Sequence, residues 1–166
     1  MKKILSALWR KVKKFIKLPL VNKLLLAEAF VMLGAGRLSV LVYPFGKIKM
    51  KVERNIEKQK NRTSLSGWPD APKDDESSRR LDDIYGVKWA VAVISRYTPW
   101  KSNCFAQALA AHYMLDRRGM VTSMHFGVAK TGTEELAAHA WLKCNDIVVT
   151  GEKGKDRFST VLDIGS

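Results

Sequence analysis

The hydrophobic period of the chain changes after Gly119, and this change limits the fold more than any other feature. Before Gly119, residues 81–97 and 103–118 carry apolar side chains about every 3.6 residues, as helices do. After it the period is two, as in a strand, at Thr122, Met124, Phe126 and Val128. Further strands are predicted over about residues 136–144, 147–150 and 158–164. Helices followed by strands predict an α+β fold in which helix 103–118 packs on one face of an antiparallel sheet.

Local start and stop signals support the boundaries of that helix. Pro99 closes the preceding helix, because proline lacks the amide that a helix interior needs. Ser102 or Asn103 can cap the next one, since short polar side chains accept the free amides of a first turn. Gly119 stands where a residue in the left-handed conformation ends a helix.

Positive charge is confined to the first third of the 166 residues. Residues 1–62 hold 16 lysines and arginines against 3 acidic residues, which accounts for the whole net charge of +13. Residues 63–166 hold 13 of each sign. We therefore predict a basic helical docking region over residues 1–62, a polar linker over 63–80 and a catalytic domain over 81–166.

The docking region is predicted to be helical. Residues 4–16 form an amphipathic helix with a cationic face, and a second helix covers residues 22–42 with its first residue as the cap. Residues 24–43 are apolar enough to span a bilayer. They contain Glu28 and Arg37, however, and each charge costs about 2.5–3.5 kcal/mol at the centre of a membrane. We therefore expect a buried or interfacial helix.

The composition also limits the cellular compartment in which the protein can work and the ligands that it can bind. Two cysteines cannot form the disulfide framework of a small secreted protein, and basic residues interrupt the apolar core of any signal peptide. We expect a cytoplasmic protein. Its basic region would dock either an acidic peptide or protein partner or the inner membrane face, where basic residues attract anionic lipids. The chain has no glycine-rich phosphate loop and no spaced set of metal ligands, so neither a cofactor nor a metal is predicted. A nucleic-acid partner is not expected, because the basic residues interleave with apolar helix faces.

Cys104 is the candidate nucleophile. It lies in the first turn of predicted helix 103–118, where free amides and the positive end of the helix dipole stabilise a thiolate. The alternative is a small buried cysteine that only packs, and position alone does not decide between the two. Cys144, on a predicted strand, lacks such a setting and is expected to be structural.

A nucleophilic thiol needs an imidazole to accept its proton, and three histidines are available. His112 lies eight residues further along the helix of Cys104, about 12 Å along its axis, and cannot reach the thiol. His125 alternates with the apolar side chains of its strand and is the weaker candidate. His139 has an alanine on either side, which leaves room for a second group, so it is the candidate general base.

A third group usually orients the imidazole, and the strand register nominates Glu152. If residues 145–146 form a two-residue turn, Cys144 pairs with Ile147, Trp141 with Thr150 and His139 with Glu152. Directly paired side chains share a face of the sheet and lie about 5 Å apart at Cβ. The alternative for Glu152 is a solvated carboxylate at a strand end.

The chain resembles the leader peptidases of lasso-peptide biosynthesis, a family of transglutaminase-like cysteine proteases, over about residues 24–164. The resemblance is carried by Pro-Trp-Lys-Ser-Asn-Cys-Phe-Ala-Gln-Ala-Leu around Cys104, by Ala-His-Ala-Trp-Leu around His139, and by shorter runs at residues 28–30, 37–38, 43–45, 117–119 and 126–130. It implies a transglutaminase/papain-like core with Cys104 as nucleophile and His139 as general base. The third residue of that family is an aspartate after the histidine strand, where this chain has Thr-Gly-Glu, so Glu152 would take its place.

The resemblance also implies a reaction and its partners. The reaction is proteolytic removal of the leader from a ribosomally made precursor peptide, together with a small leader-binding protein and a macrolactam synthetase. Cys104 would form a thioester with the substrate, and amides at the start of its helix would bind the oxyanion. Trp100 and Gln107 are candidates to line the oxyanion site or the substrate groove, with packing the simpler role for Trp100. Two alternatives are a transglutaminase-like acyltransferase and a non-catalytic protein that binds a membrane surface or a peptide.

Overall fold

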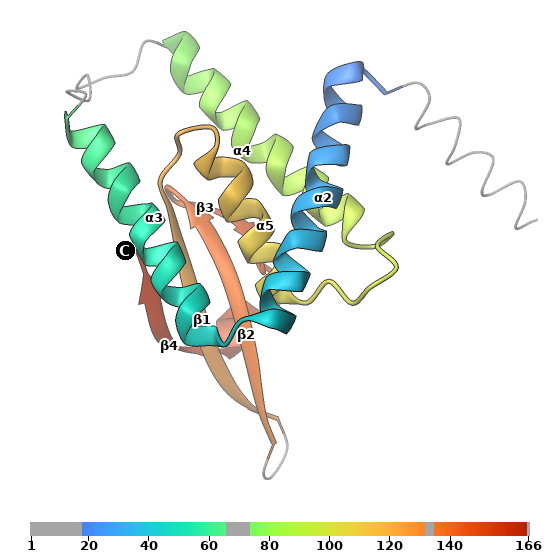
Figure 1. Ribbon diagram of the computed structural model, residues 1–166, viewed down its shortest axis with the longest axis vertical. Helices are drawn as coiled ribbons and strands as arrows, with labels where there is room; N and C mark the ends of the chain where they lie inside the picture. The colour runs from blue at the N-terminus through green and yellow to red at the C-terminus, as the bar shows by residue number, and fades with distance from the viewer. Residues whose placement is uncertain (1–17, 66–73, 132–134, 166) are drawn as a thin grey trace, which may run out of the picture.

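The computed structural model describes residues 18–65, 74–131 and 135–165. Within these residues four long helices precede a four-stranded antiparallel sheet (Figure 1). The helices are α2 (Leu20–Val42), α3 (Phe45–Leu65), α4 (Asp74–Ile94) and α5 (Cys104–Asp116). The strands are β1 (Thr122–Thr131), β2 (Glu135–Cys144), β3 (Ile147–Thr150) and β4 (Ser159–Ile164), and the short 3-10 helix η1 (Lys155–Arg157) precedes β4. The predicted α+β fold class is confirmed.

The strands lie in the order β3-β2-β1-β4, and each neighbouring pair is antiparallel. β1 and β2 form a long hairpin with a regular register, in which Gly127 pairs with His139. The ladder between β2 and β3 is short and runs only from Cys144 to Leu142. Gly119 has the left-handed conformation predicted for it, with φ at +71°, and the chain enters β1 shortly afterwards.

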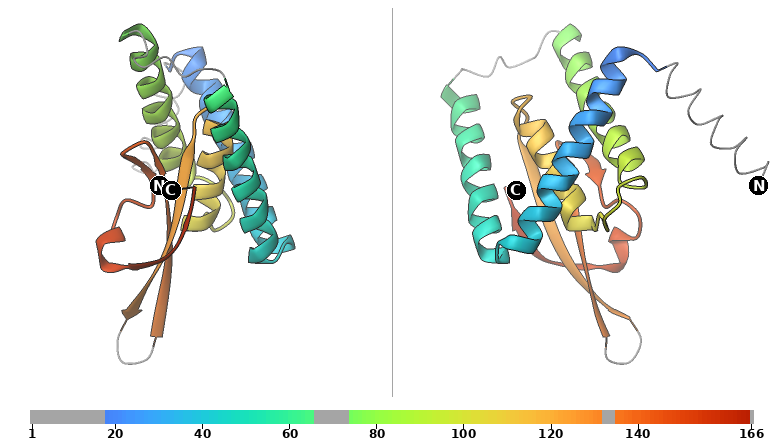
Figure 2. Two further views of the ribbon diagram at one scale, coloured as in Figure 1. Left: turned by 90° about the vertical axis from the view of Figure 1, so that its left-hand side faces the viewer. Right: turned by 45° about the vertical axis from the view of Figure 1, so that its right-hand side comes forward.

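The central element of the fold is α5. It packs between the sheet and α2, and α4 lies alongside it (Figure 1). Eight of its thirteen residues are buried, and none of the thirteen is exposed, as in a helix that is covered on all sides. The left-hand view of Figure 2 shows α2, α3 and α5 on one side of the sheet and η1 on the other. The predicted packing of the cysteine-bearing helix on one face of the sheet is therefore observed.

One hydrophobic core joins all of these elements. α2 contributes Leu26, Ala29 and Leu33, and α3 contributes Ile48, Val52 and Ile56. The same core contains Leu109 and Met114 of α5 and Leu142 of β2. The described part of the predicted docking region thus packs in one core with the predicted catalytic domain. The amphipathic helix predicted over residues 4–16 lies outside the described residues.

The start of α2 differs from the prediction. The helix begins at Leu20, directly after Pro19, and not at Asn22. The amides of a first helical turn have no partner within the helix, so the missing amide of a proline costs nothing there. Pro19 can therefore stand directly before the first residue of α2.

The predicted linker over residues 63–80 is wrong at both of its ends. Residues 63–65 close α3, and residues 74–80 form the first two turns of α4. Ion pairs one turn apart support this polar stretch, at 2.8 Å between Arg79 and Asp75 and at 2.7 Å between Arg80 and Glu76. Residues 66–73 lie outside the described part of the chain.

One apolar face of α2 remains exposed along its whole length. Its residues recur every three or four positions and are Leu20, Leu24, Ala27, Val31, Ala35, Leu38 and Val42; we call them the α2 stripe. The leucines and valines of the stripe are 60–71% exposed. By length and composition alone, α2 is the one helix of the described residues that could cross a membrane. Its other face is buried in the core, so α2 belongs to the folded domain.

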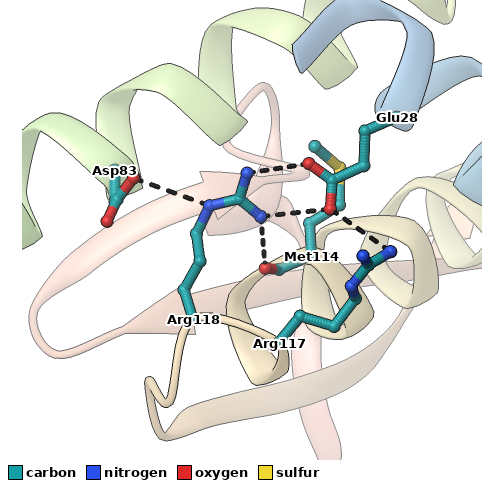
Figure 3. Close-up of polar contacts among 5 residues, drawn as sticks. All are labelled: Glu28, Asp83, Met114, Arg117 and Arg118. Atoms are coloured by element: carbon teal, nitrogen blue, oxygen red, sulfur yellow. Dashed lines mark hydrogen bonds and ion pairs between the residues drawn. The ribbon is translucent and has the colours of Figure 1, made fainter. Parts of the chain in front are cut away.

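A partly buried ion-pair network ties the end of α5 to α2 and α4 (Figure 3). The Arg118 guanidinium donates to both carboxylate oxygens of Glu28, at 2.7 and 3.2 Å, and to the Met114 carbonyl at 2.7 Å. Its Nε atom lies 3.5 Å from the Asp83 carboxylate. The hydrogen bond to Glu28 raises the pKa of Arg118. Three helices are therefore held together at the end of α5 opposite to Cys104.

Candidate active site

Cys104 is the first residue of α5, and Asn103 is its N-cap, one of the two predicted caps. The Asn103 side chain accepts the Ala106 amide at 3.0 Å, and its carbonyl accepts the Gln107 amide at 3.0 Å. In a helix the first amides have no intrahelical partner, so those of Cys104 and Phe105 remain as donors next to the thiol. The thiol is partly exposed at the positive end of the helix. The sulfur is therefore accessible and lies beside backbone donors.

Aromatic packing fixes the first turn of α5. The Phe105 ring lies 5.6 Å from the Phe45 ring and 5.3 Å from the Phe126 ring, and these two rings meet edge to face at 5.1 Å. The cluster joins α5 to the start of α3 and to β1. On the other side, α2 comes so close that a Cβ atom at Gly36 would lie 2.8 Å from the Ala106 carbonyl oxygen. Cys104 is therefore held from two directions.

The two further candidates near Cys104 have different roles. Trp100 packs its ring 5.2 Å from Phe30 and against Gly34 of α2, and its indole nitrogen is buried without a partner among the described residues. It is therefore a packing residue, the simpler of its two predicted roles. Gln107 lines the cavity of Cys104, and its amide donates to the Ser102 carbonyl at 2.7 Å.

His139 lies on β2 and makes a hydrogen bond to the backbone. Its Nε2 atom lies 2.8 Å from the carbonyl oxygen of Gly151. A carbonyl oxygen only accepts, so Nε2 must carry the proton, and Nδ1 of the neutral ring is then free to accept one. The ring stacks on Phe158 at 4.9 Å and on Trp141 at 6.0 Å. Two aromatic neighbours and one hydrogen bond thus define the orientation of the imidazole.

One cavity of about 360 Å³ brings the predicted residues together. Cys104, His139 and Glu152 all line it, although they come from α5, β2 and the segment after β3. The ladder between β2 and β3 stops at Leu142, so the cavity lies where the edge of the sheet is left open beside His139. The residues that line it also include three basic ones, Lys88, Arg96 and Lys153.

The register that nominated Glu152 is wrong. The first pair, Cys144 with Ile147, is as predicted, but the register shifts between Lys143 and Leu142, and Thr150 pairs with Leu142 instead of Trp141. β3 ends at that point, so the ladder does not extend to His139 and Glu152.

The Glu152 side chain contacts helix α4 and not His139. Its carboxylate accepts a hydrogen bond from the Lys88 ammonium of α4 at 2.8 Å, and its side chain is 59% exposed. The partner of His139 is the backbone of Gly151, which a prediction restricted to side chains as orienting groups cannot find. A glycine directly after a predicted edge strand was the available signal.

The other two histidines are engaged elsewhere. His112 is fully buried, and its Nδ1 atom lies 2.8 Å from the Thr122 hydroxyl; burial lowers its pKa to about 4. His125 pairs with Asp163 on the neighbouring strand, and its Nε2 atom lies 3.0 Å from the Ser123 hydroxyl. Neither ring lines the cavity of Cys104. The preference for His139 over both therefore agrees with the geometry.

Cys144 is a buried thiol, as predicted. Its exposed fraction is 2%, and its Sγ atom donates to the Val121 carbonyl at 3.4 Å. Burial raises the pKa of this thiol to about 11. A thiol in this state is a poor nucleophile at neutral pH, so Cys104 remains the candidate nucleophile.

Comparison with known proteins identifies the fold family. The sequence model described as "Transglutaminase-like superfamily" matches residues 49–163, which begin within α3 and end within β4. This superfamily in general covers cysteine proteases and acyltransferases. No curated protein and no solved structure matches the chain significantly. The match includes Cys104, His139 and the whole cavity between them.

Proposed function

Because the chain belongs to the transglutaminase-like superfamily, we propose that it is a cysteine peptidase that removes the leader from a ribosomally made lasso-peptide precursor. One observation carries the enzymatic part: a partly exposed cysteine at a helix N-terminus and a tautomer-fixed histidine line the same cavity. The resemblance of the motifs around Cys104 and His139 to lasso leader peptidases supports the choice of substrate.

The reaction begins with proton transfer from the thiol. His139 takes the proton of Cys104 on Nδ1, the atom left free by the hydrogen bond of Nε2 to Gly151. The thiolate attacks the carbonyl at the junction between leader and core peptide and forms a tetrahedral intermediate. The amides of Cys104 and Phe105 donate to its oxyanion. They are fixed by the cap and by the aromatic cluster before any substrate binds.

The second half of the reaction regenerates the enzyme. The protonated His139 donates its proton to the departing amine, and the acyl group remains on Cys104 as a thioester. Water, activated by the same imidazole, hydrolyses the thioester and releases the free carboxylate. No step needs a metal or a cofactor.

The cavity also supports a peptide substrate of particular charge. The residues that line it include three basic ones and one acidic one, and the acidic carboxylate is already paired with Lys88. Acidic residues of a leader peptide would be attracted to this rim. We assign the delivery of the precursor to a small leader-binding protein and the use of the released core to a macrolactam synthetase.

We place the protein in the cytoplasm, docked on the anionic inner face of the membrane through the α2 stripe. The stripe is a continuous apolar face of a helix that is otherwise packed in the core, and all of the net positive charge lies in residues 1–62. An apolar face flanked by basic residues is the chemistry that binds anionic lipid surfaces. A docked peptidase would meet its precursor at that surface.

The decisive experiment compares the two cysteines. We expect Cys104→Ala to lower precursor cleavage about a thousandfold or more, because the nucleophile is lost. Cys144→Ala is the matched control and should retain cleavage, since this thiol lies outside the cavity. Purified protein is incubated with precursor and the leader-binding protein, and the products are weighed by mass spectrometry. Cleavage by Cys104→Ala at the wild-type rate would overturn the proposal.

The same spectra separate the alternatives. A peptidase releases the leader with a free carboxylate. The masses of the leader and the core peptide together then exceed the mass of the precursor by one water. An acyltransferase gives a product in which an added amine is linked to the acyl group, and would replace the peptidase assignment. If neither product forms with any precursor, and alkylation of Cys104 leaves membrane or peptide binding unchanged, the non-catalytic alternative is correct.

A further inference from the structure

The imidazole of His139 is oriented by the backbone. Its Nε2 atom donates to the carbonyl oxygen of Gly151 at 2.8 Å, whereas in a Cys-His-acid triad a carboxylate accepts the hydrogen bond of the imidazole. We propose that the Gly151 carbonyl is the third member of this active site and fixes the tautomer of His139, so that no acidic side chain takes part. This inference rests on the proposed function in one respect: Cys104 must use the free Nδ1 atom.

Gly151 has a conformation and surroundings that only glycine fits. Its φ angle is +73°, which side-chain-bearing residues rarely adopt. A Cβ atom there would lie 2.4 Å from the Ala140 carbonyl oxygen and 2.7 Å from the Cβ atom of Trp141. Any other residue would push this segment away from β2 and move the carbonyl from His139. A glycine at position 151 therefore lets this segment of the backbone approach β2 and His139 closely.

The acidic side chain of the cavity is engaged by another element. Glu152 follows Gly151 directly and lines the same cavity, but its carboxylate is held by Lys88 of α4 at 2.8 Å. β3 ends before this residue, so the sheet does not present its side chain to His139. An exposed ion pair of this kind contributes little to stability, which makes Glu152 a residue that can be changed without unfolding the protein.

Two aromatic side chains also pack against the imidazole ring of His139. Phe158 and Trp141 both stack on the His139 ring. Trp141 stacks in turn on His125 at 5.6 Å, and His125 is hydrogen-bonded to Asp163 and Ser123. In a triad the acid fixes both the ring orientation and the tautomer. Here aromatic stacking and the hydrogen bond to the Gly151 carbonyl together fix the orientation, and the carbonyl fixes the tautomer.

The first test changes the acid. We expect Glu152→Gln to keep kcat for precursor cleavage within about threefold of wild type, because amide and carboxylate differ only in an exposed ion pair. Lys88→Met breaks the same ion pair and keeps the carboxylate, and it is the matched control for kcat; KM is left out of this comparison, because Lys88 lines the rim of the cavity. A loss of about a hundredfold or more in kcat for Glu152→Gln alone, with an unchanged thermal midpoint, would overturn the proposal.

The second test observes the tautomer and needs no substrate. In full-length protein labelled with ¹⁵N-histidine, two-bond correlations should show the neutral His139 ring protonated at Nε2, in wild type and in Glu152→Gln alike. His112→Asn and His125→Asn assign the three rings by elimination. A ring protonated at Nδ1, or a tautomer that changes in Glu152→Gln, would overturn the proposal. Because the readout is independent of cleavage, it holds even if Cys104→Ala were to disprove the peptidase function.

The third test weakens the carbonyl itself. Residues 144–166 can be made by chemical synthesis and ligated at the native Cys144, with an ester in place of the amide that joins residues 151 and 152. An ester carbonyl accepts hydrogen bonds more weakly, so we expect kcat to fall about fivefold while KM is unchanged. An ester between residues 153 and 154 is the matched control. Equal kcat for the two esters would contradict the role of Gly151.

Discussion

Replacing Gly36 by alanine tests whether α2 holds the first turn of α5 in position. Gly36 is buried, and an added Cβ atom would lie 2.8 Å from the Ala106 carbonyl oxygen and 3.6 Å from the Ala106 Cα atom. The atoms it would meet belong to the backbone, so no side chain can rotate away. Either α2 or the turn that carries Cys104 must therefore move.

The expected magnitude follows from two opposed effects. Alanine is favoured over glycine in a helix interior by about 1 kcal/mol. Overpacking of a buried contact costs about 1–3 kcal/mol. We therefore expect Gly36→Ala to lower the free energy of unfolding by about 1 kcal/mol. The effect on activity should be larger, about tenfold to a hundredfold in kcat/KM, because small displacements of a nucleophile are costly.

Gly34 offers a matched control on the same helix. A Cβ atom there would lie 3.4 Å from the Cζ2 atom of Trp100, an ordinary contact with a side chain. Gly34→Ala should keep the gain in helix propensity, with wild-type activity and up to about 1 kcal/mol of added stability. Urea unfolding followed by circular dichroism measures stability, and precursor cleavage measures activity. If Gly36→Ala equals Gly34→Ala in both assays, the reasoning about α2 and α5 is refuted.

Three further predictions concern pH, thiol reactivity and lipid binding. Burial lowers the pKa of His112 from 6.5 to about 4, so the unfolded chain binds more protons between these pH values. About 3 kcal/mol of the free energy of unfolding present above pH 6.5 should therefore be lost by pH 4. Urea unfolding of His112→Gln should show a smaller loss over the same pH range, and equal losses in the variant and the wild type would contradict this. At pH 7.5 iodoacetamide should label Cys104 but not Cys144 in the native protein, because burial raises the pKa of the Cys144 thiol to about 11; equal labelling in peptide mass spectra would disprove it. The double change Leu24→Gln and Leu38→Gln should abolish flotation with anionic vesicles at an unchanged melting temperature, and unaltered flotation would remove the membrane proposal.

The start of the helix that carries Cys104 could be predicted from the sequence because capping is local. Asn103 accepts an amide three residues further on, and this depends on a few neighbouring positions only. The same holds for Gly119, whose left-handed conformation ends the connection from α5. The position of the nucleophile relative to free backbone donors follows from these two short segments.

The partner of His139 could not be predicted, because it depends on a bulge. A two-residue turn gave the correct pairing of Cys144 with Ile147, and the alternation of apolar residues gave no sign of the shift between Lys143 and Leu142. One extra residue changes every pair beyond it. The resulting error placed Glu152 opposite His139, where the structure has no ladder.

The first turns of α4 were missed for a different reason. Composition alone predicts a linker for a polar stretch with several charges. Its charges are, however, spaced four residues apart with opposite sign, at Asp75 and Arg79 and at Glu76 and Arg80. That spacing supports a solvent-facing helix and was the available signal.

The ion pair between Glu28 and Arg118 has a consequence for synthesis of the protein on the ribosome. Its two residues are 90 positions apart, and α2 packs its core face mainly against α5 and α4. At typical translation rates, roughly 5 to 20 seconds pass between the synthesis of these residues. During that interval the core face of this apolar 23-residue helix lacks these partners, and the α2 stripe on its other face is exposed as well. The nascent chain therefore presents α2 to chaperones and membranes before the cavity of Cys104 exists.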